Sequence, residues 1–208
     1  MQEKKTIEKT EMIEDLLVPI EDYLKAGIHI GSQYKTGHMD PYIYKTRQDG
    51  LHVLDIKNVD KHLRLGASFL SDYEPGNILV VAGRVYARKP AREFAGSIGA
   101  MLSVKRFVPG TLTNPRNPNF VEPDVVMVSD PGVDKQATKE AIKTRIPVIA
   151  LCDTNNLLTN VDICVPINNK GKKALALTYW LLAREILLKR GMIKKSTDFK
   201  KTIEDFEA

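Results

Sequence analysis

Short apolar runs that stop abruptly at polar or glycine-containing turns recur along the chain. Four or five apolar residues in a row, without alternation, are typical of a strand that is buried on both faces, as in a parallel sheet. A short run that contains charged residues, 103–107, is taken as a further strand. The pattern therefore predicts five strands, over residues 78–82, 103–107, 125–128, 148–151 and 163–165.

Segments with helical periodicity occur before, between and after these strands. Asn58 is the expected N-cap of one helix, Pro90 is expected in the first turn of another, and Gly191 is expected to end the last one. Alternating strands and helices favour a three-layer α/β domain, in which helices cover both faces of a parallel sheet. Helices are predicted over residues 20–26, 58–74, 90–100, 134–145 and 171–190.

Two further segments have patterns of their own. The runs at residues 42–44 and 51–56 flank the turn signal Asp49-Gly50, which predicts a hairpin. Residues 108–123 contain four prolines, which indicates an ordered or partner-binding loop rather than a low-complexity segment.

The length of 208 residues fits one domain, which we expect over residues 17–191. We expect residues 1–16 to form a flexible acidic leader and residues 192–208 a polar tail, and both ends to order only against partners. No apolar run approaches the ~20 residues of a membrane span. The N-terminus also lacks the apolar core of a signal peptide. We therefore expect a cytoplasmic protein without membrane contact.

Charge is distributed unevenly along the chain. The formal net charge is +5, yet residues 1–22 carry three Lys against seven acids, and residues 192–208 are balanced. Residues 23–191 therefore hold 24 Lys and Arg against 15 Asp and Glu. A basic domain of this kind favours a polyanionic partner, most commonly nucleic acid.

The carboxyl ends of parallel strands are where open α/β sheets bind ligands, but phosphate-binding chemistry is missing from this sequence. Residues 83–89 lack the second glycine and the Ser/Thr of a P-loop. Asp130 and Asp153 follow two strands, where a carboxylate repels phosphate and suits a capped turn. The Asn-rich loops at residues 153–156 and 168–170 are interpreted as turns bonded to themselves.

Catalytic and metal-binding patterns are also missing. The four histidines are too far apart for the usual zinc spacings, and no nucleophile elbow is present. Cys152 and Cys164 lie in or beside apolar runs, as expected of buried reduced thiols. We predict no catalytic residue, metal, cofactor or small-molecule substrate. The alternative left open is a nucleotide- or phosphosugar-binding enzyme that uses the strand-end loops.

Basic residues gather in loops and at helix starts, in part beside tyrosines. Such interleaving suits contacts with RNA phosphates and exposed bases. The candidate RNA-binding residues are Lys35, Lys45, Arg47, Arg84, Arg88, Lys89, Arg92, Lys105, Arg106, Arg116, Lys170, Lys172 and Lys173.

Several segments in residues 17–191, among them RFVPGTLTNP, ALCDTNN and VPINNKGKKA, resemble the universal ribosomal protein two family of the small subunit. The form is similar to archaeal members and to the eukaryotic laminin-receptor-precursor protein. It lacks the coiled-coil insertion that bacterial members carry after the GTLTN motif. The resemblance implies a flavodoxin-like (Rossmann-like) fold with five parallel strands.

The resemblance also implies a function. Members of the family are structural, non-catalytic constituents of the small ribosomal subunit, near the junction of head and body. They contact small-subunit rRNA and neighbouring ribosomal proteins, and so support subunit assembly and translation. The competing hypothesis then becomes a flavodoxin-like enzyme.

Overall fold

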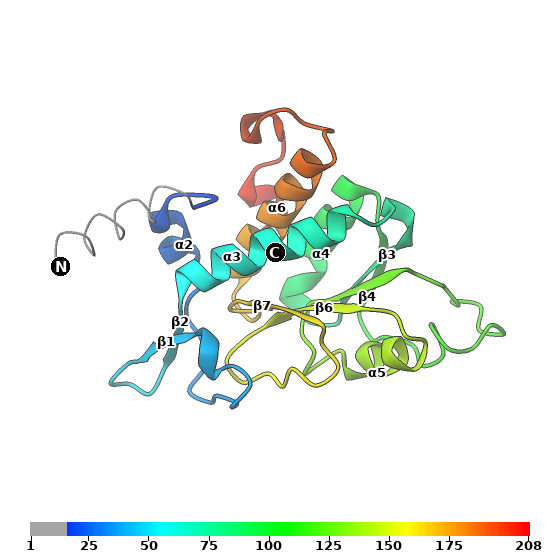
Figure 1. The fold of residues 1–208 in the computed structure, drawn as a ribbon, viewed down its shortest axis with the longest axis horizontal. Coiled ribbons are helices and arrows are strands. Elements are labelled where there is room, and N and C mark those ends of the chain that lie inside the picture. Colours follow the sequence, from blue (N-terminus) through cyan, green and yellow to red (C-terminus); the bar gives the residue numbers. More distant parts are fainter. Residues whose placement is uncertain (1–15) are drawn as a thin grey trace.

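The computed structural model of the chain describes residues 16–208. Its centre is a five-stranded, entirely parallel sheet with the strand order β4-β3-β5-β6-β7 (Figure 1). The side chains of the three middle strands are buried without exception, as their unbroken apolar runs predict. The strands are β3 (Ile78–Ala82), β4 (Met101–Val104), β5 (Val125–Val128), β6 (Val148–Cys152) and β7 (Ile163–Pro166).

Helices cover both faces of the sheet and confirm the three-layer α/β/α architecture (Figure 1). Three helices, α3, α4 and α6, pack side by side on one face, and α5 lies on the other. Helix α6 is buried on most sides, because it lies between α3 and α4 and against the sheet. The bounds are α3 (Ile56–Ser71), α4 (Val85–Ile98), α5 (Lys135–Lys143) and α6 (Lys172–Lys189).

A smaller unit precedes the sheet in the chain. Helix α2 (Ile20–Ala26) ends at Gly27, and strands β1 (Ile43–Thr46) and β2 (His52–Leu54) form the predicted antiparallel hairpin. A single bridge between Ile30 and Val53 adds the segment after α2 to this hairpin. Two one-turn 3₁₀ helices complete the described elements before β3, at Asp40–Tyr42 and Pro75–Asn77.

Several predicted boundaries differ from the structure, and β4, for example, begins at Met101 rather than at residue 103. Three of the differences have a local cause. Helix α3 begins before Asn58, because the carboxylate of Asp55 caps it by accepting a hydrogen bond from Lys57 N at 3.1 Å. Helix α4 begins at Val85, directly after the turn that ends β3, so Pro90 lies inside the helix rather than in its first turn. Strand β4 ends at Val104, because the backbone of Lys105 adopts a left-handed conformation with φ of 73°.

The end of α6 follows the prediction. Gly191 lies just beyond the helix with φ of 69°, a conformation that glycine adopts without steric cost. Its N–H donates to the carbonyl of Leu188, and the N–H of Met192 donates to that of Leu187. These bonds satisfy carbonyls that the helix end would otherwise leave free.

The C-terminal segment differs from the expectation that it orders only against partners. A 3₁₀ turn (Ser196–Asp198) and α7 (Ile203–Phe206) fold back onto α4 and α6 of the same chain. Phe206 is fully buried, and Trp180 donates its indole N–H to the carbonyl of Lys201 at 2.7 Å. Aromatic residues in an otherwise polar segment thus provide the apolar contact. The predicted leader, residues 1–16, lies outside the described residues except for Leu16.

Cys152 and Cys164 are free and buried, as predicted. Of the helices in residues 16–208, none combines the length and the apolar character needed to cross a bilayer.

Candidate nucleic-acid interface

The parallel sheet brings the loop after every strand to one side, which we call the carboxyl edge. Helices α4, α5 and α6 also begin there, because each follows directly from such a loop. The edge therefore combines residues that lie far apart in the sequence. Its loops are residues 83–84, 105–106, 129–134, 153–156 and 167–171.

Two of these loops, residues 153–156 and 167–171, bond to themselves and to each other. We call them the closed loops. Asn156 Oδ1 accepts hydrogen bonds from Asp153 N at 2.7 Å and from Asn169 Nδ2 at 3.0 Å. Asn156 Nδ2 donates to Asp130 Oδ1 at 3.0 Å, which ties these loops to the loop after β5. Asn156 thereby uses both its donor and its acceptor capacity inside the protein.

Asn168 forms hydrogen bonds within its own loop at the start of α6. Its Oδ1 accepts from the N–H groups of Lys170 and Gly171 at 3.0 and 3.1 Å, and so forms an Asx turn that leads into the helix. The interpretation of the Asn-rich loops as self-bonded turns is confirmed.

Residues 27–39 cover the closed loops from outside. Thr36 donates its N–H to the carbonyl of Thr154 at 3.0 Å and its hydroxyl to the carbonyl of Asn156 at 2.6 Å. Gly31 has no room for a side chain, because a Cβ there would meet Thr154 Cγ2 and lie 2.8 Å from the carbonyl oxygen of His52. The chain itself thus covers the carboxyl ends of β6 and β7.

The strand order reverses between β3 and β5, where flavodoxin-like folds bind phosphate groups. Here the guanidinium of Arg84 pairs with the buried carboxylate of Asp130. The carboxylate of Asp134 accepts the N–H of Gly83 at 3.2 Å, a donor that would otherwise point at an anion. Two carboxylates of the chain therefore occupy the place of a bound phosphate.

Burial perturbs the carboxyl group of Asp134 at this edge. Burial raises its pKa from 3.8 to about 6, the charge of Asp130 adds to the shift, and the hydrogen bond from Gly83 opposes it. Within residues 16–208, no three His, Cys, Asp or Glu side chains lie close enough together to bind a metal ion.

Four of the thirteen predicted RNA-binding cations make a close ion pair or hydrogen bond within the chain, at less than 3.0 Å. Besides Arg84, Lys170 pairs with the buried Asp153 at 2.6 Å and Lys35 pairs with Asp40 at 2.9 Å. Lys89 donates to the carbonyl of Glu207 at 2.6 Å. Arg84 and Lys170 neutralise buried carboxylates, and so their first role is in the fold.

Five other predicted cations lie at the carboxyl edge without an ion-pair partner among the described residues. We call Arg88, Lys105, Arg106, Lys172 and Lys173 the open cation cluster. Arg88, Lys105 and Arg106 line a pocket of about 370 Å³ between the loops that follow β3, β4 and β5. Arg88 donates one Nη to the carbonyl of Gly83, while its buried Nε has no partner in the described structure.

Lys172 and Lys173 belong to the first turn of α6 and are exposed. The ammonium of Lys172 lies 4.8 Å from the ring centroid of Tyr86, which is in the first turn of α4. This contact joins the starts of α4 and α6, so the two parts of the cluster lie on neighbouring elements.

The structure does not bring the remaining four predicted cations to this edge. Lys45 and Arg47 lie on and beside β1 of the hairpin, Arg92 lies in the second half of α4, and Arg116 lies in the proline-rich loop. Lys45 and Arg47 were predicted because tyrosines lie near them in the sequence. The fold does not place them on the same surface as the cluster.

Glu140 is a structural anchor that the sequence analysis missed. Its buried carboxylate accepts the N–H groups of Gly110 and Leu112 at 2.8 and 3.1 Å, and so holds the start of the proline-rich loop against α5. Burial alone would raise the pKa of this carboxyl, but four hydrogen bonds together lower it. An acid next to Ala141 on the apolar face of α5 was the signal available in the sequence.

Comparison with known proteins establishes the family. The model of a family described as "Ribosomal protein S2" matches residues 23–119 and 116–188. The chain belongs to the ribosomal protein S2 family.

Two curated relatives of the ribosomal protein S2 family come from archaea, in keeping with the archaeal resemblance. The chain is 52% identical over 196 residues to the "Small ribosomal subunit protein uS2" of Picrophilus torridus, an alignment that covers 94% of this chain and 98% of the relative. It is 51% identical over 194 residues to the protein of the same name from Haloquadratum walsbyi, which covers 93% of this chain and 68% of the relative.

Proposed function

We propose that this chain is a structural constituent of the small ribosomal subunit that binds small-subunit rRNA and neighbouring ribosomal proteins. Its membership of the ribosomal protein S2 family carries the proposal. The location near the junction of head and body, the support of subunit assembly and the cytoplasmic ribosome as its site all follow from the resemblance described above.

We further propose that the open cation cluster supplies the main contact with rRNA. Lys105 and Arg106 are exposed and have no carboxylate partner among the described residues, so binding a phosphate breaks no ion pair there. Arg84 and Lys170 would have to leave a buried carboxylate uncompensated, which costs several kcal/mol per ion. The cations with free charge are therefore the better rRNA ligands.

A non-catalytic role fits the edge of the sheet. Asp130 and Asp134 occupy the crevice where a flavodoxin-like enzyme would hold a phosphate, and the segment over residues 27–39 covers the adjacent strand ends. The two carboxylates place negative charge where a bound phosphate would lie, and the covering segment closes the ends of β6 and β7.

Sedimentation of a lysate tests the proposal. The epitope-tagged chain, expressed at its natural level, is expected in the small-subunit fraction of a sucrose gradient at low salt. A chain that sediments only as a free protein would overturn the ribosomal assignment. Lys105→Gln/Arg106→Gln is expected to move part of the chain to the free fraction. The matched control Lys143→Gln/Lys189→Gln removes two exposed cations from the opposite ends of α5 and α6, and is expected to stay with the subunit.

A further inference from the structure

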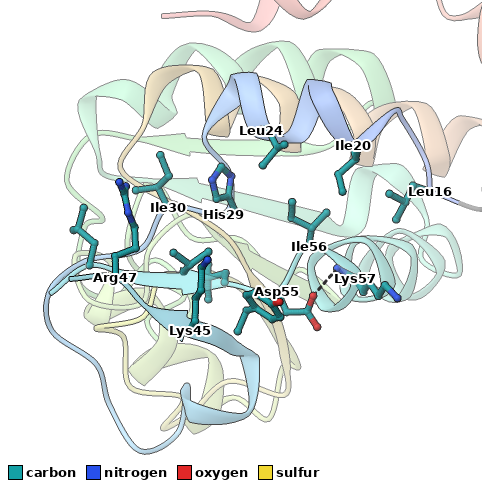
Figure 2. A pocket seen from close by; sticks show the side chains of 14 residues that line it. Leu16, Ile20, Leu24, His29, Ile30, Lys45, Arg47, Asp55, Ile56 and Lys57 are labelled. Atoms are coloured by element: carbon teal, nitrogen blue, oxygen red, sulfur yellow. Dashed lines mark hydrogen bonds between the residues drawn. The ribbon is translucent and has the colours of Figure 1, made fainter. Parts of the chain in front are cut away.

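A groove of about 710 Å³ lies between α2, the β1–β2 hairpin and the start of α3 (Figure 2). It is separate from the carboxyl edge and contains none of the open cation cluster. This volume is in the range of pockets that enclose several side chains of a ligand. The groove therefore has room for a short segment of a partner.

The walls of the groove are aliphatic. Figure 2 shows Ile20 and Leu24 of α2 facing the groove, with Ile30 beside the hairpin and Ile56 at the start of α3. Ile20, Leu24 and Ile30 are 39%, 48% and 37% exposed, although aliphatic side chains of this size are usually buried. Scattered exposed residues of this kind are normal, but several around one hollow mark an interaction site.

The rim of the groove is positively charged. Lys45, Arg47 and Lys57 line it, and the one acid among the described lining residues, Asp55, already accepts the N–H of Lys57 as the cap of α3 (Figure 2). Arg47 makes only a loose, half-exposed pair with Asp49 at 3.8 Å. A ligand with carboxylates beside its apolar residues would complement this rim.

His29 adds a polar atom to the lining. Its Nδ1 is buried and has no hydrogen-bond partner in the described part of the chain. Burial lowers the pKa of this imidazole, a hydrogen bond with the backbone of Tyr23 opposes the shift, and the positive charge of Arg47 adds to it. The neutral ring can exchange a hydrogen bond with a bound backbone, which would satisfy the free atom.

We propose that the groove receives an apolar segment of a neighbouring ribosomal protein that carries Asp or Glu beside its apolar residues. The inference rests on the proposed function and adds the surface and the chemistry of the partner. Aliphatic walls exclude water from apolar side chains, whereas an RNA backbone would leave its phosphates against hydrocarbon. The cationic rim then selects segments with carboxylates and disfavours basic ones.

Site-specific crosslinking identifies the occupant. Cys152 and Cys164 are buried, so Leu24→Cys offers the one readily accessible thiol of the described residues for a benzophenone maleimide. The labelled full-length chain is added to small subunits from which the native protein has been removed, irradiated, and analysed by mass spectrometry. Ile142→Cys on α5, which is 43% exposed, carries the same label as the control.

The expected product is a crosslink from position 24 to an apolar peptide of another ribosomal protein, with Asp or Glu within a few residues. Lys45→Glu/Lys57→Glu should lower its yield by about fivefold, as the loss of about 1 kcal/mol of charge attraction predicts. Four results would overturn the proposal. They are a crosslink to rRNA, a crosslink to residues 1–15 of the same chain, the absence of a crosslink at position 24, and a yield that the charge reversal does not change. If the chain labelled at the control position 142 also fails to enter the subunit fraction, the proposed function fails as well.

Discussion

Two regions of the carboxyl edge use polar residues in opposite ways. In the closed loops the polar side chains form hydrogen bonds within the protein. Asn156, Asn168 and Asn169 each bond to a neighbouring segment or to the backbone of their own loop. The open cation cluster, a short distance away on α4, α6 and the loop after β4, keeps its charges free of carboxylates among the described residues. One region completes the fold, and the other is the surface proposed to bind a partner.

The difference follows from the reach of the side chains. Asn, Asp and Thr have short polar groups that meet nearby backbone N–H groups before they meet solvent, and so they favour turns. Lys and Arg have long stems that carry the charge away from the backbone. Charge alone does not separate the two roles, because Arg84 and Lys170 neutralise buried Asp130 and Asp153. The decisive feature is whether a buried carboxylate lies within reach.

The largest expected effect comes from breaking the closed loops. Asn156→Ala removes the acceptor for Asp153 N and Asn169 Nδ2 and leaves buried polar groups unpaired. The free energy of unfolding in urea should fall by about 2–4 kcal/mol. Asn155→Ala next to it, exposed and bonded only to Lys170, should change it by about 0.5 kcal/mol or less. Equal losses for the two variants would contradict the role given to Asn156.

The pH dependence of stability tests the carboxylates at the strand-order reversal. The folded-state pKa of Asp134 is raised to about 6, so the stability that its protonated form contributes is present below pH 4 and is lost as pH rises through 6. Asp134→Asn keeps an acceptor for Gly83 N without the charge. Its unfolding free energy should exceed that of the natural protein by about 2–3 kcal/mol at pH 7 and match it near pH 4. A difference independent of pH would refute the assignment.

A smaller effect is expected where residues 27–39 cover the closed loops. Gly31→Ala places a methyl group against Thr154 Cγ2 and the backbone of His52, and should cost about 1–3 kcal/mol of unfolding free energy. Gly37→Ala has open space around its Cβ and a permitted backbone conformation, so it serves as the control with little change. If both variants are equally stable, the segment does not pack as tightly as the structure indicates.

Much of the sheet could be predicted from the sequence, because its signals are local. Residues 78–82 and 125–128 are unbroken apolar runs, and each matches a strand of the structure at both ends. The Asn-rich turns were also predictable, since Asn168 bonds to N–H groups two and three residues away. The end of β4 was missed because it depends on one left-handed residue, Lys105, for which lysine gives no signal.

The rest depends on contacts between distant residues. Thr36 bonds to a loop about 120 positions further along, and Phe206 is buried against helices that precede it by many residues. No local pattern predicts either contact. The same holds for the candidate cations. The sequence shows which residues are charged, but only the fold shows which of them, such as Arg84, are already paired with a carboxylate.

We propose that the open cation cluster binds rRNA, whereas the paired cations maintain the fold. The most direct test is the salt dependence of binding to small-subunit rRNA for Lys105→Gln/Arg106→Gln beside Lys143→Gln/Lys189→Gln. The first variant should flatten the slope of log K against log salt by about 0.7–0.9 per lost phosphate contact, and the second should leave the slope unchanged. Equal slopes for both variants, or a loss confined to the second, would show that the open cation cluster does not supply the main phosphate contacts.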